Sequence, residues 1–94
     1  MLPAFEWDDA KAEVNSRKHG VTFDEAKTVF LDASADIVPD SQHSDDEERF
    51  RVTGFSERER LLAVIFTERH ETIRIVSARK ATASEKAAYD ENFR

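Results

Sequence analysis

The side chains in this sequence with the clearest chemical potential are arginines, because a guanidinium stays charged and binds phosphate oxygens through a fork of donors. Arg79 is the first candidate for binding phosphate and stabilising a transition state. It closes an expected strand, and a second cation, Lys80, follows it. The structural alternative for Arg79 is a salt bridge to Glu85 or a solvated strand end.

Three further arginines could extend this phosphate-binding surface. Arg74 lies in the middle of the same expected strand, and Arg49 and Arg51 belong to the basic face of another. On a regular strand Arg74 and Arg79 would project from opposite faces, so they share one site only if the strand bulges or ends near Ala78. The alternative for Arg74 is a cross-strand ion pair, which contributes well under about 1 kcal/mol when exposed.

Histidine and lysine supply candidate groups for proton transfer and phosphate binding. An unperturbed imidazole has a pKa of about 6.5, which suits acid or base work near neutral pH. His43 lies in a loop among acids that favour its protonated form, so it suits a general acid or has no role at all. Lys18 and His19 close a helix, where they could reach the reacting phosphate or only complement the helix dipole.

Two other residues are weaker candidates, and no metal site is expected. Tyr89 could position a phosphate or stack on a base, although an aromatic residue at helical spacing is commonly core. Glu48 could pair with Arg49 or orient a cation. The histidines have no ligand four residues away on an expected helix, and the acidic loop lacks the spacing and glycine of an EF-hand. We therefore predict neither a metal nor a cofactor.

Apolar spacing and capping residues predict the elements that must position these groups. The expected helices cover residues 9–19, 23–31 and 83–91, and the expected strands lie near residues 5–7, 35–38, 49–54, 61–66 and 72–78. Short connections make the last four strands an antiparallel meander. The order β-α-α-β-β-β-β-α, with two helices before the meander and one after it, predicts an α+β domain.

Length and charge restrict the class of protein. Ninety-four residues form a single domain, 1–94, which buries about 60–65 % of its unfolded surface. The sequence has no cysteine, no signal peptide and no apolar run long enough for a membrane span, so we expect a cytoplasmic protein. The net charge is −6, but residues 49–80 hold eight Lys/Arg against four Asp/Glu, a balance of +4. That basic segment is either a solvated strand surface or part of a binding site for an anion.

Several segments resemble the BrnT family of bacterial toxins. They are Phe5-Glu6-Trp7-Asp8 with Lys11 and Asn15, Arg17-Lys18-His19-Gly20-Val21-Thr22-Phe23, Asp40 with His43 and Glu48-Arg49, Arg74-Ile75-Val76-Ser77-Ala78-Arg79-Lys80-Ala81, and Glu85 with Tyr89. Their order and spacing cover nearly the whole chain. Two positions depart from the family pattern, because relatives often carry His where this chain has Phe66 and Gly where it has His70.

The resemblance implies a RelE-like fold, ribonuclease activity in the free toxin and a BrnA-type antitoxin. Such an antitoxin blocks the toxin and supplies a ribbon-helix-helix part that binds DNA for autorepression. Cleavage of RNA without a metal needs a base for the 2′-hydroxyl, an acid for the leaving 5′-oxygen and cations for the transition state. The candidates for catalysis are Arg79, Arg74, His43, Lys18 and His19. The candidates for RNA binding are Arg49, Arg51, Lys80 and Tyr89.

A second hypothesis keeps the fold but assigns another role. The chain would then be a catalytically weak or inactive toxin that acts as a binding module and assembles with a DNA-binding antitoxin. The acidic net charge and Phe66 favour this version. A plain globular domain without any link to toxins is the third possibility.

Overall fold

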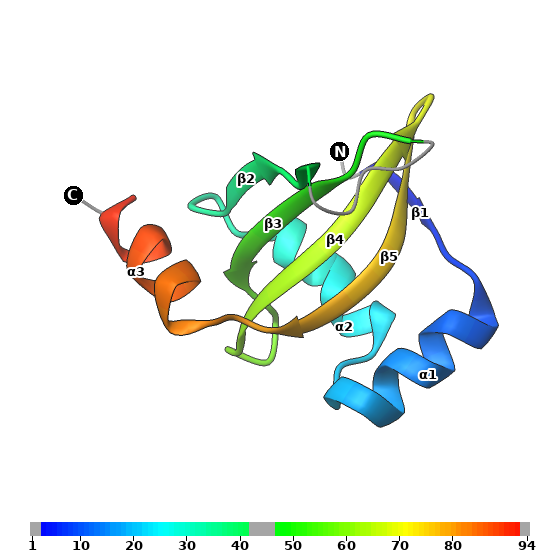
Figure 1. Ribbon diagram of the computed structural model, residues 1–94, viewed down its shortest axis with the longest axis horizontal. Helices are drawn as coiled ribbons and strands as arrows, with labels where there is room; N and C mark the ends of the chain where they lie inside the picture. The colour runs from blue at the N-terminus through cyan, green and yellow to red at the C-terminus, as the bar shows by residue number, and fades with distance from the viewer. Residues whose placement is uncertain (1–2, 42–46, 93–94) are drawn as a thin grey trace.

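The structure is a computed structural model that describes residues 3–41 and 47–92. Figure 1 shows a curved sheet with α2 behind it, α1 beside one end of β5, and α3 at the opposite side. In chain order the elements are β1 (Ala4–Glu6), α1 (Asp9–His19), α2 (Phe23–Lys27), the 3₁₀ helix η1 (Thr28–Leu31), β2 (Asp36–Pro39), β3 (Phe50–Phe55), β4 (Leu61–Arg69), β5 (Thr72–Lys80) and α3 (Ala83–Glu91). None of the described helices is long and apolar enough to cross a membrane. The expected α+β class is confirmed.

The sheet is mixed, with the strand order β1-β5-β4-β3-β2. The expected antiparallel meander is present, because β2, β3, β4 and β5 pair in succession. β1 adds a fifth strand that runs parallel to β5, with Phe5 opposite Ile73. The sequence assigned no partner to this N-terminal strand, because its three residues find their partner almost seventy residues along the chain.

The last two strands are longer than the sequence predicted. β4 continues to Arg69 and β5 begins at Thr72, so the expected turn over residues 68–71 shrinks to His70 and Glu71. His70 has φ 59°, a left-handed conformation that glycine adopts more readily. A two-residue connection gives the tightest hairpin, and pairing therefore extends beyond the apolar run that marked the strand.

A β-bulge interrupts the pairing of β4 with β5. Ile65 lies opposite Ser77 and Phe66 lies opposite Ile75, so Val76 is the extra residue. An extra residue reverses the alternation of side chains along a strand. Ile75 and Ala78 therefore both face the core, whereas Ser77 and Arg79 project from the opposite face. Arg74 and Arg79 were expected to share a face only if the strand bulges or ends near Ala78, and the bulge at Val76 places them on the same face.

The hydrophobic core lies between one face of the sheet and the segment formed by α2 and η1. Phe23, Ala26 and Val29 from that segment pack against β3, β4 and β5. Phe66 is fully buried in this core and contacts the rings of Phe30 and Phe50. Phe66, which departs from the family pattern, is thus a core residue and lies on the opposite face of the sheet from Arg79.

The helix ends follow the capping signals in the sequence. Asp8 caps α1 by accepting from the Lys11 amide, and Gly20 ends the helix with φ 69°. Thr22 caps α2, but only half of the expected capping box forms there. The carboxylate of Glu25 binds Arg60 and Ser56 instead of turning back to the cap, and α2 passes into η1 after five residues.

Candidate active site

A pocket of about 310 Å³ lies on the face of the sheet opposite the core. We call it the arginine pocket, and it is lined by His19, Asp40, Arg49, Arg51, Ile65, Val76, Ser77 and Arg79. It combines one imidazole and one carboxylate with three guanidinium groups. Four residues that the sequence singled out for catalysis or RNA binding thus meet in one place, although the net charge of the chain is −6.

The arginine pocket is assembled from elements that are distant in the sequence. Arg51 lies in β3 and Arg49 directly precedes that strand, whereas His19 closes α1. Arg79 reaches the pocket from β5 because the bulge at Val76 has reversed the side-chain alternation. The bulge therefore decides whether the strongest candidate from the sequence faces this pocket or the core.

Glu85 from α3 holds two of the arginines in place. Arg79 donates from Nη1 to Oε1 at 2.7 Å and from Nη2 to Oε2 at 2.9 Å, the bidentate geometry of a strong ion pair. The Nε of Arg51 lies 3.3 Å from Oε2 of the same carboxylate. The side chain of Glu85 is only 7 % exposed, and the hydrogen bonds from Arg79 lower its pKa to about 2. The salt bridge to Glu85, which was the structural alternative for Arg79, is therefore present. It also fixes the orientation of the Arg79 guanidinium at the pocket.

Both arginines keep donors that Glu85 does not use. Among the described residues, Arg79 directs three of its five N–H groups to Glu85 and to the carbonyl of Lys80, and its side chain stays 34 % exposed. Arg51 Nε is buried and makes no hydrogen bond within the described part of the chain, although its distance to Glu85 allows an ion pair. The distance gives the charge pairing, whereas the angle is wrong for hydrogen bonding. A phosphate oxygen in the pocket can accept from the donors of Arg79 that Glu85 and Lys80 leave unused.

Asn15 fastens α1 to the free edge of β5. Beyond Arg74, none of the strands in the described residues pairs with β5 on that side, and the amide of Asn15 binds the strand edge instead. Its Nδ2 donates to the carbonyls of Ala78 and Val21 at 2.9 and 3.0 Å, and its Oδ1 accepts from the Ala78 amide at 3.1 Å. This contact fixes the end of α1, and with it His19, beside the residues that precede Arg79.

Replacing Asn15 by Ala should lower the free energy of unfolding by about 2–4 kcal/mol. The substitution leaves one N–H and two C=O groups buried without partners, and each such group costs about 1–3 kcal/mol. Urea denaturation followed by circular dichroism measures the change. Glu13→Ala on the exposed side of α1 is the matched control and should stay within about 0.5 kcal/mol of the parent. Equal midpoints for Asn15→Ala and the control would contradict the role given to this amide.

Arg60 also stabilises the C-terminal end of α1. Its guanidinium binds the carboxylate of Glu25 through two nitrogens and donates to the carbonyl of Gly20 at 3.0 Å. The hydrogen bonds from Arg60 lower the pKa of Glu25. Because Gly20 follows His19 directly, this ion pair restricts the position of the imidazole at the pocket.

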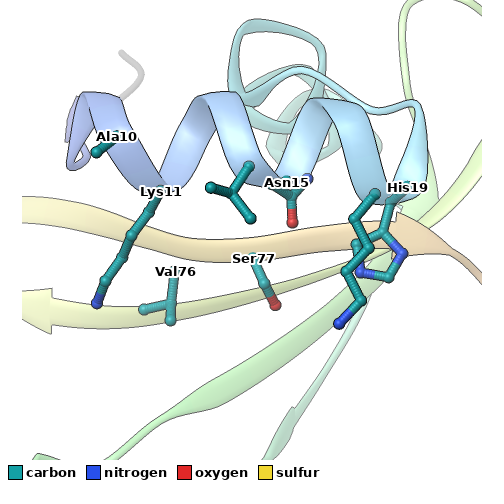
Figure 2. Close-up of a pocket in the computed structure, with 8 residues that line it drawn as sticks. Ala10, Lys11, Asn15, His19, Val76 and Ser77 are labelled. Carbon is teal, nitrogen blue, oxygen red and sulfur yellow. The ribbon is translucent and has the colours of Figure 1, made fainter.

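A second hollow, of about 360 Å³, continues from the arginine pocket along α1. We call it the α1–β5 groove, and it is lined by Ala10, Lys11, Val14, Asn15, Lys18, His19, Val76 and Ser77. Figure 2 shows Lys11, Val76, Ser77 and His19 following one another between the helix and the strand. His19, Val76 and Ser77 line both hollows, so they form the border between them. Lys18 thus lies in the groove, on the far side of His19 from the arginines.

The comparison with known families decides what kind of protein carries this site. A family model for BrnT, the ribonuclease toxin of type II toxin–antitoxin systems, matches residues 7–85. The chain belongs to this family. A search of the curated proteins finds no match. Both hollows fall within the matched residues, so the pocket is part of the BrnT domain.

A solved structure of the family has a similar fold. The Brucella abortus ribonuclease toxin BrnT superposes with a TM-score of 0.67 and 24 % sequence identity, over 85 % of this chain and 97 % of that one. At this identity the likeness concerns the fold alone. It shows that the mixed sheet with its helices is an arrangement that a BrnT toxin adopts.

Four of the predicted site residues lie outside the arginine pocket of this BrnT-family chain: Arg74, Lys80, Tyr89 and Lys18, the last of which lines the α1–β5 groove. Arg74 is on the same face but donates to Glu6 of β1 at 2.6 Å, the ion pair offered as its alternative. Lys80 is exposed beyond the pocket. Tyr89 is 1 % exposed, and its hydroxyl donates to Asp32 at 2.6 Å; burial and this carboxylate raise its pKa to about 12. From this interior position Tyr89 attaches α3 to the end of η1.

His43 lies outside the described residues, and some residues of the pocket were not predicted as part of a site. Asp40 is buried at the pocket, and Ser77 presents a hydroxyl at its border with the groove. Glu85 was expected only as a helix-capping residue or as a partner of Arg79. In the sequence, the bulge that turns Ser77 toward the pocket could be noticed only as a break in the alternation of apolar and polar residues. Val76, between Ile75 and Ser77, is itself apolar and obscures that break. Among the described residues, no group of three or more acidic or histidine side chains could hold a metal ion.

Proposed function

We propose that this BrnT-family chain cleaves RNA at the arginine pocket by acid–base chemistry that needs no metal. The observation that carries the proposal is the meeting of His19 with Arg49, Arg51 and Arg79 around one hollow of about 310 Å³. A sheet with helices packed on it also supports the RelE-like fold implied by the resemblance. The family of ribonuclease toxins to which the chain belongs makes RNA the substrate to test first.

The residues of the pocket match the needs of the reaction. Attack by the 2′-hydroxyl on the neighbouring phosphate requires a group that accepts its proton, and the imidazole of His19 fits that part. Arg79 and Arg51 bind the non-bridging oxygens, where negative charge accumulates in the transition state. Arg49 extends the binding of phosphate along β3. His43 stays the candidate for protonating the leaving oxygen on sequence grounds, because it lies in the loop between Asp40 and Arg49, both of which line the pocket.

An antitoxin completes the proposal. We infer a BrnA-like partner with a ribbon-helix-helix part, which covers the basic surface, blocks access of RNA and links the toxin to DNA. The chain itself then contacts DNA only within that complex. Its site of action would be the bacterial cytoplasm, where RNA and the antitoxin are both present.

The decisive experiment measures RNA cleavage by the purified chain, without antitoxin, in the presence and absence of EDTA. Equal cleavage in both is expected, because side chains supply every group that the reaction needs. His19→Gln should lower kcat about 100-fold or more, the range of general acid–base catalysis. Loss of parental cleavage in EDTA, restored by added Mg²⁺, would contradict the metal-independent mechanism.

A second candidate function is a BrnT fold that assembles with a DNA-binding antitoxin but cleaves poorly. The net charge of −6 and the engagement of Arg79 by Glu85 favour it. Absence of cleavage by soluble parent and variants alike, together with a stable complex with the antitoxin, would support this alternative.

A further inference from the structure

The α1–β5 groove is basic, although the chain as a whole is acidic. The chain carries 20 acidic residues, yet the eight residues that line the groove include Lys11 and Lys18 and no carboxylate. The two lysines are seven residues apart on α1, which places them on the same side of the helix about two turns apart. The spacing gives the groove a cation near each of its ends.

The floor of the groove is apolar. Val14 is 53 % exposed, which is unusual for a valine in the middle of a helix, and it faces the half-buried Val76 across the groove. Val76 is the extra residue of the β-bulge, and it precedes Ser77 at the border between the groove and the arginine pocket. The groove thus offers two valine side chains for packing, with an ammonium group on either side.

The groove is continuous with the arginine pocket. His19, Val76 and Ser77 line both, so a chain that leaves the arginines past His19 enters the groove directly. Figure 2 shows His19 at one end of this row and Lys11 at the other. Single-stranded nucleic acids need such a combination of cations for the backbone and a flat or apolar surface for the bases.

We propose that the α1–β5 groove binds the nucleotides that flank the scissile phosphate of a single-stranded RNA. Lys11 and Lys18 bind backbone phosphates, and Val14 and Val76 pack against a base. Lysine contacts to phosphates and valine contacts to a base do not depend on base identity, so the groove extends affinity more than sequence preference. This inference rests on the proposed ribonuclease function, because it assumes that the scissile phosphate lies in the arginine pocket.

Binding is tested with a 2′-O-methyl RNA octanucleotide, which cannot be cleaved because its 2′-oxygens are blocked. Fluorescence anisotropy compares the parent, the double variant Lys11→Gln/Lys18→Gln and the control Lys27→Gln/Lys86→Gln. The control removes the same charge from surface ion pairs outside the groove. The groove variant should raise Kd about tenfold, and the slope of log K against log salt should fall by about 1.4, since each phosphate contact contributes about 0.7.

Cleavage of a short and a long RNA separates this inference from the proposed function. The single variant Lys11→Gln, at the end of the groove away from His19, should lower kcat/KM for an octanucleotide about threefold and leave that for a dinucleotide unchanged, because the dinucleotide does not reach Lys11. If the parent cleaves neither RNA while the groove variant still weakens binding, the ribonuclease proposal fails and the groove stands. An equal loss on both substrates would overturn the groove.

The outcome that most directly overturns the inference is an unchanged Kd. If the groove variant binds the octanucleotide as the control does, yet loses affinity for an acidic antitoxin, then the groove is a protein-docking surface. Backbone amide shifts at Lys11, Val14 and Val76 on titration with the octanucleotide give an independent check. Shifts confined to the arginine pocket would likewise overturn the inference.

Discussion

Replacing Arg79 by Ala should lower kcat/KM for RNA cleavage by about 100- to 1000-fold, the loss typical when one donor to a developing negative charge is removed. Of the arginines in the pocket, Arg79 makes the strongest contact with Glu85, because it donates two hydrogen bonds to that carboxylate. The N–H groups that Glu85 and Lys80 do not use are the ones available to a phosphate oxygen. A steady-state assay on a short RNA measures the change.

Two further variants show whether the fork or only the charge of Arg79 is needed. Arg79→Lys keeps the charge but loses the bidentate geometry, so it should recover only part of the activity. Arg58→Ala is the matched control, because Arg58 is an exposed arginine in the turn between β3 and β4. It should cleave like the parent.

Loss of folding must be separated from loss of chemistry at Arg79. Without Arg79 the buried carboxylate of Glu85 still has Arg51 and the Thr82 amide nearby. Circular dichroism should confirm that the variants are folded at the assay temperature. Expression in a bacterial host gives a second readout, since growth arrest by the parent should be relieved by Arg79→Ala. A folded Arg79→Ala protein with activity within threefold of the parent would remove Arg79 from the site.

Because of Glu85, the free energy of unfolding should decrease as the pH falls. Its pKa is lowered from an ordinary 4.5 to about 2, first by the hydrogen bonds from Arg79 and then by the Thr82 amide and Arg51. A carboxyl whose pKa is lowered by folding stabilises the fold above its unfolded pKa. That contribution is lost as the pH falls from about 4.5 through 2. The shift corresponds to about 3 kcal/mol at pH 7.

The substitution Glu85→Gln isolates this contribution from those of the other carboxyls. At pH 7 the variant should be about 3 kcal/mol less stable than the parent in urea, and the difference should shrink as the pH approaches 2. Glu91→Gln on the exposed side of α3 is the control and should track the parent at every pH. A deficit for Glu85→Gln that stays constant between pH 7 and pH 3 would show that packing, not the ionised carboxylate, is what Glu85 provides.

Glu85→Gln should also affect catalysis, because the same carboxylate positions two arginines of the pocket. A neutral amide holds Arg79 and Arg51 less firmly, and we expect kcat to fall more than the affinity for RNA changes. This split distinguishes a positioning residue from one that only stabilises α3.

Most helix ends and the candidate functional side chains can be predicted from residues that are close together in the chain. Asp8 and Gly20 mark the ends of α1, and Thr82 with Glu85 forms the capping box of α3. These signals act between residues within one turn of each other, so they can be read without tertiary structure. The cations at Arg49, Arg51 and Arg79 were also visible, together with the family resemblance.

Which of those groups lie together in one pocket depends on contacts between distant segments. The bulge at Val76 depends on how β5 pairs with β4, and it sets the face from which Arg79 projects. The amide of Asn15 brings α1 to Ala78, 63 residues away, and thereby brings His19 to the arginines. Register and helix docking depend on contacts between segments far apart in the chain, and residue spacing within a segment does not encode those contacts. The sequence therefore supplied the candidate groups, and the packing of β5 against β4 and α1 selected among them.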